Sequence, residues 1–215
     1  MTVRVKVCGI TSYEDAAMAL ACGVDALGFN FYRPSPRYID PAEVRAIIRR
    51  LPPLATTVGV FVNVEPPADV AEMARAAGVG VLQLHGDETA EYCRCLADWT
   101  LIKALRIGDE GIDAELQAYP VQAFLLDSRH DNLFGGTGKT FDWSFCHAVG
   151  SVRPVILSGG LGPANVAEAI RCVKPYGVDV CSGVESAPGR KDSGKLKAFM
   201  DEVTNVRGES RHGTR

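Results

Sequence analysis

The feature that most constrains the fold of this chain is a repeated alternation of short apolar runs and helical patterns. Eight apolar runs of strand length occur, and no interval between consecutive runs suits an antiparallel hairpin. Parallel strands need crossover connections, so repeated strand–helix units predict either an open doubly wound sheet or a closed barrel. The expected strands are Val3–Cys8, Ala26–Phe31, Thr56–Val62, Val81–His85, Leu101–Ile107, Ala123–Asp127, Pro154–Ser158 and Gly177–Val180.

Helix signals fill the intervals between these strands. Ser12 can cap the first helix, and Gly23 and Gly78 are typical helix-ending residues. The expected helices are Tyr13–Cys22, Pro41–Leu51, Pro67–Ala77, Thr89–Ala97, Ile112–Ala118, Trp143–Val149, Pro163–Val173 and Leu196–Val206. Eight strands with eight helices favour a single-domain (β/α)8 TIM barrel. An open sheet usually carries a GxGxxG turn after its first strand, and this chain has Cys8-Gly9-Ile10-Thr11 there.

The composition limits the partners and the setting of the chain. Its net charge is -3 and its pI is about 5.8, so neither a nucleic acid nor an anionic membrane is expected as a partner. No apolar run reaches the roughly 18 residues that span a bilayer, and the N-terminus enters a strand rather than a signal segment. The seven cysteines form no CxxC pair, which favours a reducing, cytoplasmic setting without disulfides or a zinc site. The barrel is expected over residues 1–206, and the polar tail 207–215 is expected to be disordered.

A barrel gathers the carboxyl ends of its strands on one face, where the active sites of such enzymes lie. Cys8, His85 and Asp127 each end an expected strand, and Arg37 lies on the loop after the second. Cys8 and Asp127 are candidates for a base and acid pair, although a buried cysteine and a turn aspartate are common structural residues. Arg37 is a candidate carboxylate ligand or a solvated surface arginine, and His85 binds either a ligand or a loop carbonyl. Lys6 and Gln83 are polar within apolar strands, as barrel interiors near a ligand allow.

Glycine-bearing loops follow the seventh and eighth expected strands. Gly159-Gly160 and Cys181-Ser182-Gly183 present backbone N–H groups on the two loops that usually hold phosphate in barrels. Glycines also relax ordinary turns, but two clusters on these adjacent loops favour a phosphate site.

The longest loop, Ser128–Thr140, follows the sixth expected strand. Its segment Gly135-Gly136-Thr137-Gly138-Lys139-Thr140 looks like a phosphate-binding Walker loop, but Leu133 stands where the first glycine is required. The segment also does not join its strand directly to a helix. ATP binding is therefore not expected, and we interpret the loop as a flexible active-site loop that is a candidate lid.

Seven co-linear motifs, spread over residues 3–205, resemble the phosphoribosylanthranilate isomerase family. The motifs are Lys6-Val7-Cys8-Gly9-Ile10-Thr11, Ser35-Pro36-Arg37-Tyr38, Val81-Leu82-Gln83-Leu84-His85-Gly86, Leu126-Asp127, Gly136-Thr137-Gly138 before Phe141-Asp142-Trp143, Leu157-Ser158-Gly159-Gly160-Leu161, and Val178-Asp179 through Gly183-Val184-Glu185. One departure is Cys181, where the family often has serine. A backbone contact to phosphate would survive this change, and a hydroxyl contact would not.

The resemblance implies a role for each matching residue. It implies that Cys8 is the general base, that Asp127 is the general acid, and that Arg37 holds the anthranilate carboxylate. It also implies that Asp179 contacts sugar hydroxyls and that the Gly160 and Ser182 regions hold phosphate. The implied reaction is the Amadori rearrangement of N-(5-phosphoribosyl)anthranilate in tryptophan biosynthesis. Neither a metal nor an organic cofactor is expected, since an iminium makes the sugar C2 proton acidic, and the chain is expected to be a monomer or a homodimer.

Two alternatives stay open from the sequence. Another phosphosugar barrel enzyme, such as indole-glycerol-phosphate synthase or an isomerase of broader specificity, would share the phosphate loops. The synthase would need a catalytic lysine on the second strand, where the sequence has none. A catalytically silent phosphosugar-binding regulator would need neither Cys8 nor Asp127, so their joint presence favours an enzyme.

Overall fold

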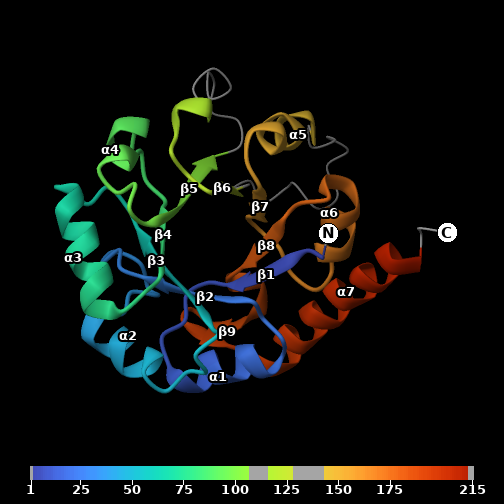
Figure 1. Cartoon of the computed structure of the whole chain (residues 1–215). Coiled ribbons are helices and arrows are strands. Elements are labelled where there is room, and N and C mark those ends of the chain that lie inside the picture. Colours follow the sequence, from blue (N-terminus) through green and yellow to red (C-terminus); the bar gives the residue numbers. More distant parts are fainter. Residues whose placement is uncertain (1, 107–115, 128–142, 213–215) are drawn as a thin grey trace.

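The computed structural model describes residues 2–106, 116–127 and 143–212 (Figure 1). Eight parallel strands form a closed barrel in the order of the chain, with β8 paired to β1. This confirms the expected (β/α)8 TIM barrel. The strands are β1 (Arg4–Val7), β2 (Ala26–Asn30), β3 (Thr56–Phe61), β4 (Val81–Leu84), β5 (Thr100–Arg106), β6 (Ala123–Asp127), β7 (Val155–Ser158) and β8 (Gly177–Val180).

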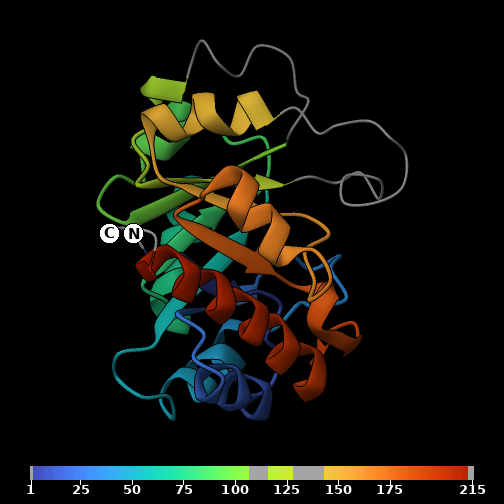
Figure 2. The same ribbon diagram turned by 90° about the vertical axis from the view of Figure 1, so that its right-hand side faces the viewer.

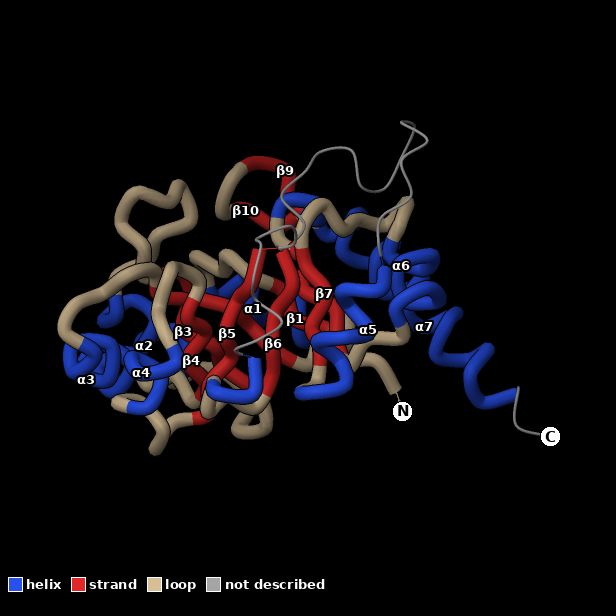
Figure 3. Tube along the Cα trace, turned by 90° about the horizontal axis from the view of Figure 1, so that it is seen from above, coloured by secondary structure: helices blue, strands red, loops and turns tan. Residues whose placement is uncertain are grey.

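Helices cover the outside of the barrel, and the strands occupy its centre (Figure 3). The α-helices among the described residues are α1 (Tyr13–Ala21), α2 (Pro41–Ile48), α3 (Pro67–Ala77), α4 (Ala90–Arg94), α5 (Trp143–Val152), α6 (Val166–Val173) and α7 (Ser193–His212). Only Leu116–Ala118 of the helix expected at Ile112–Ala118 is described, and it forms a 3-10 turn. The rest of that helix and the loop Ser128–Thr140 lie outside the described residues.

Local sequence signals set several helix ends. The hydroxyl of Ser12 accepts a hydrogen bond from the backbone N–H of Asp15, as expected for the cap of α1. Asp40 and Glu43 form a capping box at the start of α2. Gly78 ends α3 in the left-handed conformation, with φ of 79°, which a residue with a side chain rarely adopts.

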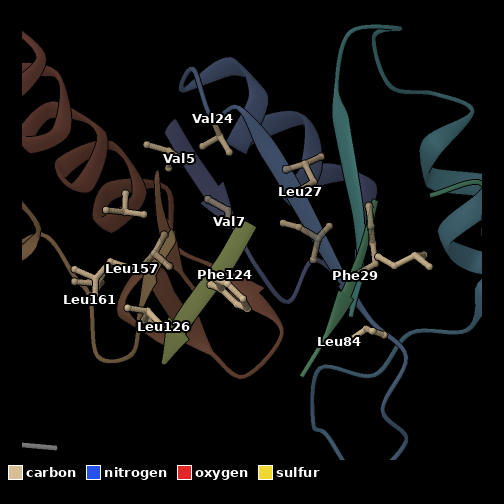
Figure 4. Close-up of a cluster of buried hydrophobic side chains, with 14 of the residues drawn as sticks. Val5, Val7, Val24, Leu27, Phe29, Leu84, Phe124, Leu126, Leu157 and Leu161 are labelled. Atoms are coloured by element: carbon tan, nitrogen blue, oxygen red, sulfur yellow. The ribbon is translucent and has the colours of Figure 1, made fainter. Parts of the chain in front are cut away.

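Side chains point alternately outward and inward along each strand, and this alternation separates two clusters of apolar residues. Val5, Val7, Leu84 and Leu126 are buried in the large cluster between barrel and helices, part of which is shown in Figure 4. A smaller cluster comprises Val58, Ile102, Ala104, Ala123, Leu125 and Ile156. Because neighbouring residues of a strand point to opposite faces, residues between those of the first cluster point into the barrel.

Two features at the C-terminal end of the chain differ from the expectation. A short antiparallel hairpin that the sequence did not predict follows β8 and consists of β9 (Glu185–Ala187) and β10 (Arg190–Lys191). Its strands are too short and too polar to show as apolar runs. The turn places Gly189 at φ of 77°.

The last helix also differs, since α7 continues to His212 instead of ending at Val206. Residues 207–212, which were expected to be disordered, are therefore helical. The guanidinium of Arg207 donates to the carbonyl of Val3 and pairs with Asp25, and Glu209 pairs with Arg171 of α6. These contacts tie Arg207 to the barrel and Glu209 to α6. Figure 2 shows α7 running along the outside of the molecule next to α6. Although α7 is long, no helix among the described residues is apolar enough to cross a membrane.

Candidate active site

A cavity of about 640 Å³ opens at the carboxyl ends of the strands. The lining contains every candidate residue from the sequence except Gly183, which follows the lining residue Ser182. The lining candidates are Cys8, Arg37, His85, Asp127, Gly159, Gly160, Asp179 and Ser182. A larger cavity of about 830 Å³ lies at the opposite end of the barrel and contains none of them. The chemistry therefore points to the smaller cavity as the active site.

The alternation of the strands explains why these side chains meet. In β1, β4, β6 and β8 the apolar residues of the large cluster pack outward against the helices. The intervening residues, which point into the barrel, include Lys6, Gln83, Asp127 and Asp179. Cys8 continues the inward face of β1 by two residues beyond Lys6.

Cys8 lies immediately beyond β1 and next to the end of β8. Its backbone N–H donates to the carbonyl of Val180 at 2.9 Å, and the strands pair Val7 with Val180. This register places Cys8 beside Cys181. A Cβ on Gly28 of β2 would lie 2.9 Å from the Cys8 sulfur and 3.0 Å from the Lys6 amine. A glycine at position 28 therefore makes room for both groups.

The surroundings of Cys8 favour its thiolate. The hydrogen bond from the Cys181 thiol and the positive charge of Lys6 outweigh burial and the Asp179 charge, and lower the pKa of Cys8 to about 6. The same hydrogen bond, together with burial, raises the pKa of Cys181. Of the two thiols, Cys8 is therefore the one that ionises more readily, and Cys181 stays protonated, with its sulfur also 3.8 Å from a carboxylate oxygen of Glu185.

Lys6 and Asp179 form a buried ion pair beneath Cys8. Their nitrogen and oxygen atoms are 2.9 Å apart, and each side chain is 5% exposed. The hydroxyl of Ser158 donates to the second carboxylate oxygen of Asp179 at 3.1 Å. Burial would lower the pKa of Lys6, but the charges of Asp179 and Cys8 and the hydrogen bonds to both together outweigh burial and raise the pKa. Lys6 thus stays a cation close to the thiolate.

Asp127 ends β6 and contacts an imidazole from the loop after β4. The Nε2 atom of His85 is 3.2 Å from Oδ2 of Asp127. The Nδ1 atom of His85 is 2.8 Å from the amide nitrogen of Gln83. Both ring nitrogens of His85 therefore have protein partners.

Arg37 is held by a carboxylate that the sequence did not single out. Its Nε atom donates to Glu185 at 2.9 Å and its Nη2 atom at 2.6 Å, which is the bidentate arrangement. The Lys191 amine is 2.8 Å from the same carboxylate and also donates to the carbonyl of Cys8. Burial would raise the pKa of Glu185, but the hydrogen bonds from Arg37 and Lys191 outweigh it and lower the pKa. Glu185 thus stays ionised beside the cavity.

The two glycine-bearing loops have different geometries. Gly159 and Gly160 both adopt positive φ angles, of 89° and 63°. The helix after them, α6, starts at Val166 instead of the expected Pro163, so these glycines lie in a loop away from the helix terminus. A Cβ on Gly183 would lie 2.0 Å from the carbonyl oxygen of Leu161. Gly183 therefore allows the loops after β7 and β8 to pack closely together.

Comparison with known proteins decides the family. A family model described as N-(5'phosphoribosyl)anthranilate (PRA) isomerase matches residues 5–202. The chain belongs to this family. It is 46% identical over 208 residues to the N-(5'-phosphoribosyl)anthranilate isomerase of Pelobacter propionicus, covering 97% of this chain and 99% of that protein.

Two solved structures of phosphoribosylanthranilate isomerases resemble the chain closely. One, in complex with reduced 1-(o-carboxyphenylamino)-1-deoxyribulose 5-phosphate, is 41% identical and superimposes with a TM-score of 0.82, covering 94% of this chain and 99% of that one. The other contains monomers generated from the dimeric enzyme of Thermotoga maritima. It is 38% identical with a TM-score of 0.80, covering 94% of this chain and 98% of that one.

Sequence reasoning did not find two charged residues of the site, Glu185 and Lys191. Glu185 occurs in a family motif, but nothing in its local sequence indicates that it holds Arg37, 148 positions away. Lys191 lies in the unexpected hairpin. The polar character of Lys6 inside an apolar strand was the one signal that pointed to its buried ion pair.

Proposed function

We propose that Cys8 is the general base and Asp127 the general acid in the isomerisation of N-(5'-phosphoribosyl)anthranilate. The observation that carries the proposal is a thiol whose pKa is lowered to about 6 in the same cavity as a carboxyl group. The two groups come from β1 and β6, which β7 and β8 separate in the barrel. Acid–base catalysis needs a proton acceptor and a proton donor at different points around the substrate, as in this arrangement.

The activity itself agrees with membership of the phosphoribosylanthranilate isomerase family. The chain catalyses an Amadori rearrangement, which is an aldose–ketose isomerisation in tryptophan biosynthesis. The product is 1-(2-carboxyphenylamino)-1-deoxyribulose 5-phosphate, and the relative with a bound ligand holds the reduced form of this compound.

The mechanism has two proton transfers on the substrate. Asp127 donates a proton to the furanose ring oxygen, the bond from that oxygen to C1 breaks, and the anilino nitrogen forms a Schiff base with C1. The thiolate of Cys8 then removes the proton from C2, and the electron pair of that bond moves toward the iminium nitrogen. The resulting enolamine tautomerises to the ketone. Because the pKa of Cys8 is lowered to about 6, the thiolate is favoured at neutral pH, and the base is ready for the second step.

The remaining candidates bind the substrate in this proposal. Glu185 occupies Nε and one proton of Nη2 of Arg37, so the guanidinium would bind the anthranilate carboxylate through Nη1. Asp179 would accept sugar hydroxyls in addition to its bonds with Lys6 and Ser158, since each carboxylate oxygen has two lone pairs.

In this proposal the backbone N–H groups of the loops after β7 and β8 bind the phosphate. The residues concerned are Gly159, Gly160, Ser182 and Gly183, the first three of which line the cavity. A backbone site of this kind does not depend on a hydroxyl at position 181. It therefore tolerates Cys181 where the family often has serine.

The test is the decay of fluorescence of freshly generated phosphoribosylanthranilate. Cys8→Ser and Asp127→Asn are each expected to lower turnover by about two orders of magnitude or more, the scale of an acid–base group. Cys95→Ser is a matched control because Cys95 is exposed and lies outside the cavity lining. Near-normal turnover in Cys8→Ser would show that Cys8 is not the general base, and near-normal turnover in Asp127→Asn would show that Asp127 is not the general acid.

The assembly state and the cellular setting are also proposals. A dimeric relative that was converted to monomers supports a monomer or a homodimer for this chain. Light scattering after size-exclusion chromatography distinguishes the two. Seven free cysteines support a reducing, cytoplasmic setting, which fractionation of cells that express the chain would test.

A further inference from the structure

We propose that His85 is a positioning residue for Asp127 and that Gln83 keeps its imidazole neutral, so that Asp127 can carry the proton it donates. This inference rests on the proposed role of Asp127 as the general acid. It replaces the expectation that His85 contacts the substrate.

The first argument is the use of the two ring nitrogens. Nδ1 lies 2.8 Å from the Gln83 amide nitrogen, and Nε2 lies 3.2 Å from the Asp127 carboxylate. An imidazole has only these two hydrogen-bonding atoms. With both engaged by the protein, His85 has no ring nitrogen left for a substrate group, although the ring borders the cavity.

The second argument is the burial of Gln83. This side chain points into the barrel from β4 and is 1% exposed, and its amide oxygen has no hydrogen-bond partner among the described residues. If the amide were turned over, the NH₂ group with its two donors would lose its partner instead. Either orientation leaves one amide group without a partner, and the orientation with the nitrogen on His85 leaves the acceptor oxygen rather than a group with two N–H donors.

The third argument concerns the proton on the ring. An amide nitrogen is only a donor, so Nδ1 of His85 must be an acceptor and carry no hydrogen. The single ring proton then lies on Nε2 and points to Asp127. A second proton would place two donors face to face at Nδ1, so Gln83 opposes formation of an imidazolium.

A neutral His85 ring favours the protonated form of Asp127 more than a charged ring would, and a general acid must be protonated to donate its proton. An imidazolium at 3.2 Å would form an ion pair with Asp127, favour the carboxylate and make the carboxyl group a poorer proton donor at neutral pH. The neighbouring strands add little opposing charge. Arg106 of β5 stands beside Asp127 in the ladder, but its guanidinium is directed to Asp87 at 3.9 Å, and the β7 neighbour is the uncharged Ser158.

The first experiment measures the protonation of the ring by nitrogen NMR on the whole chain labelled with ¹⁵N-histidine. The chain contains four histidines, so the spectrum of His85→Gln identifies the His85 signals by their loss. The expected result near neutral pH is a neutral ring with its proton on Nε2. A proton on Nδ1, or a doubly protonated ring, would overturn the proposal without any reference to activity.

The second experiment is a double-mutant cycle in the fluorescence assay. His85→Ala is expected to lower kcat by about tenfold to a hundredfold and to leave KM within about twofold, because a displaced acid slows the chemical step. Added to Asp127→Asn, the same change is expected to cause no further loss. An additive loss, or an effect carried mainly by KM, would refute the positioning role. Near-normal activity of Asp127→Asn alone would instead show that Asp127 is not the general acid. The NMR experiment would still test the protonation of His85 in that case.

The third experiment replaces the donor at Nδ1. Gln83→Glu supplies an acceptor of similar shape and is expected to add a proton to Nδ1 and to lower kcat by about tenfold. Gln117→Glu makes the same chemical change at an exposed position outside the cavity lining and is expected to be neutral. Circular dichroism checks that the variants fold. A folded Gln83→Glu protein with an unchanged ring and unchanged kcat would contradict the role of Gln83.

Discussion

Replacing Cys181 with alanine tests whether its thiol activates Cys8, the proposed general base. Cys181 donates a hydrogen bond to Cys8 from the neighbouring strand end, and this bond is the largest influence on the lowered pKa of Cys8. Alanine removes the donor and leaves the charges of Lys6 and Asp179 in place. The pKa of Cys8 should therefore rise toward its ordinary value.

The size of the effect follows from the strength of the bond. A hydrogen bond to a charged group is worth about 1.5 to 3 kcal/mol, which corresponds to about one to two pKa units. The pKa of Cys8 would thus move from about 6 to between about 7 and about 8. The active form exists above the pKa, so the acidic limb of the rate profile moves to higher pH. Activity should fall about 5-fold to 50-fold near pH 6 and hardly at all near pH 9.

The assay is kcat/KM as a function of pH, with the ultraviolet absorbance of the thiolate as an independent titration of Cys8. Cys181→Ser keeps a donor and should retain an acidic limb close to that of the original protein. Cys172→Ala changes an exposed cysteine and should be neutral. An unchanged acidic limb in Cys181→Ala, or an equal shift in the serine variant, would refute the reasoning.

Three further substitutions test other parts of the site and the core. Glu185→Gln removes the negative charge that holds the arginine of the cavity, so KM should rise by about tenfold with kcat within about twofold in the fluorescence assay. Gly183→Ala places a Cβ 2.0 Å from the carbonyl oxygen of Leu161, so the loops after β7 and β8, which are proposed to bind phosphate, must separate. We expect weaker competitive inhibition by inorganic phosphate, whereas Gly80→Ala, with open space around its Cβ, should leave it unchanged. Leu82→Ala removes a fully buried side chain and should lower the free energy of unfolding by about 2 to 5 kcal/mol in a denaturant titration, and a loss below about 1 kcal/mol would contradict its place in the core.

Much of the fold could be predicted from the chain alone because its signals are local. Each strand of the barrel is a mainly apolar run, and caps such as Ser12 and stops such as Gly78 act within one helical turn. The hairpin after β8 and the extension of α7 were not predictable in this way. The first is too short to show a period, and the second depends on contacts of Arg207 with Val3 and Asp25.

The candidate site was predictable to the extent that barrel geometry gathers strand ends. Eight of the nine candidate residues line one cavity because they follow the inward face or the carboxyl end of a strand. The role of His85 did not follow from its position. Only the distances to Gln83 and Asp127 show that the protein itself uses both ring nitrogens.

The sequence by itself determined the order of strands and helices, the closed barrel and the residue types at the strand ends, since these depend on neighbours along the chain. The tertiary structure alone decided which charges meet. Lys6 pairs with Asp179 from 173 positions away, and Arg37 pairs with Glu185 from 148 positions away. A pKa depends on burial and on charges within a few ångströms, and barrel closure brings such distant residues together. The lowered pKa of Cys8 is therefore a property of the folded barrel.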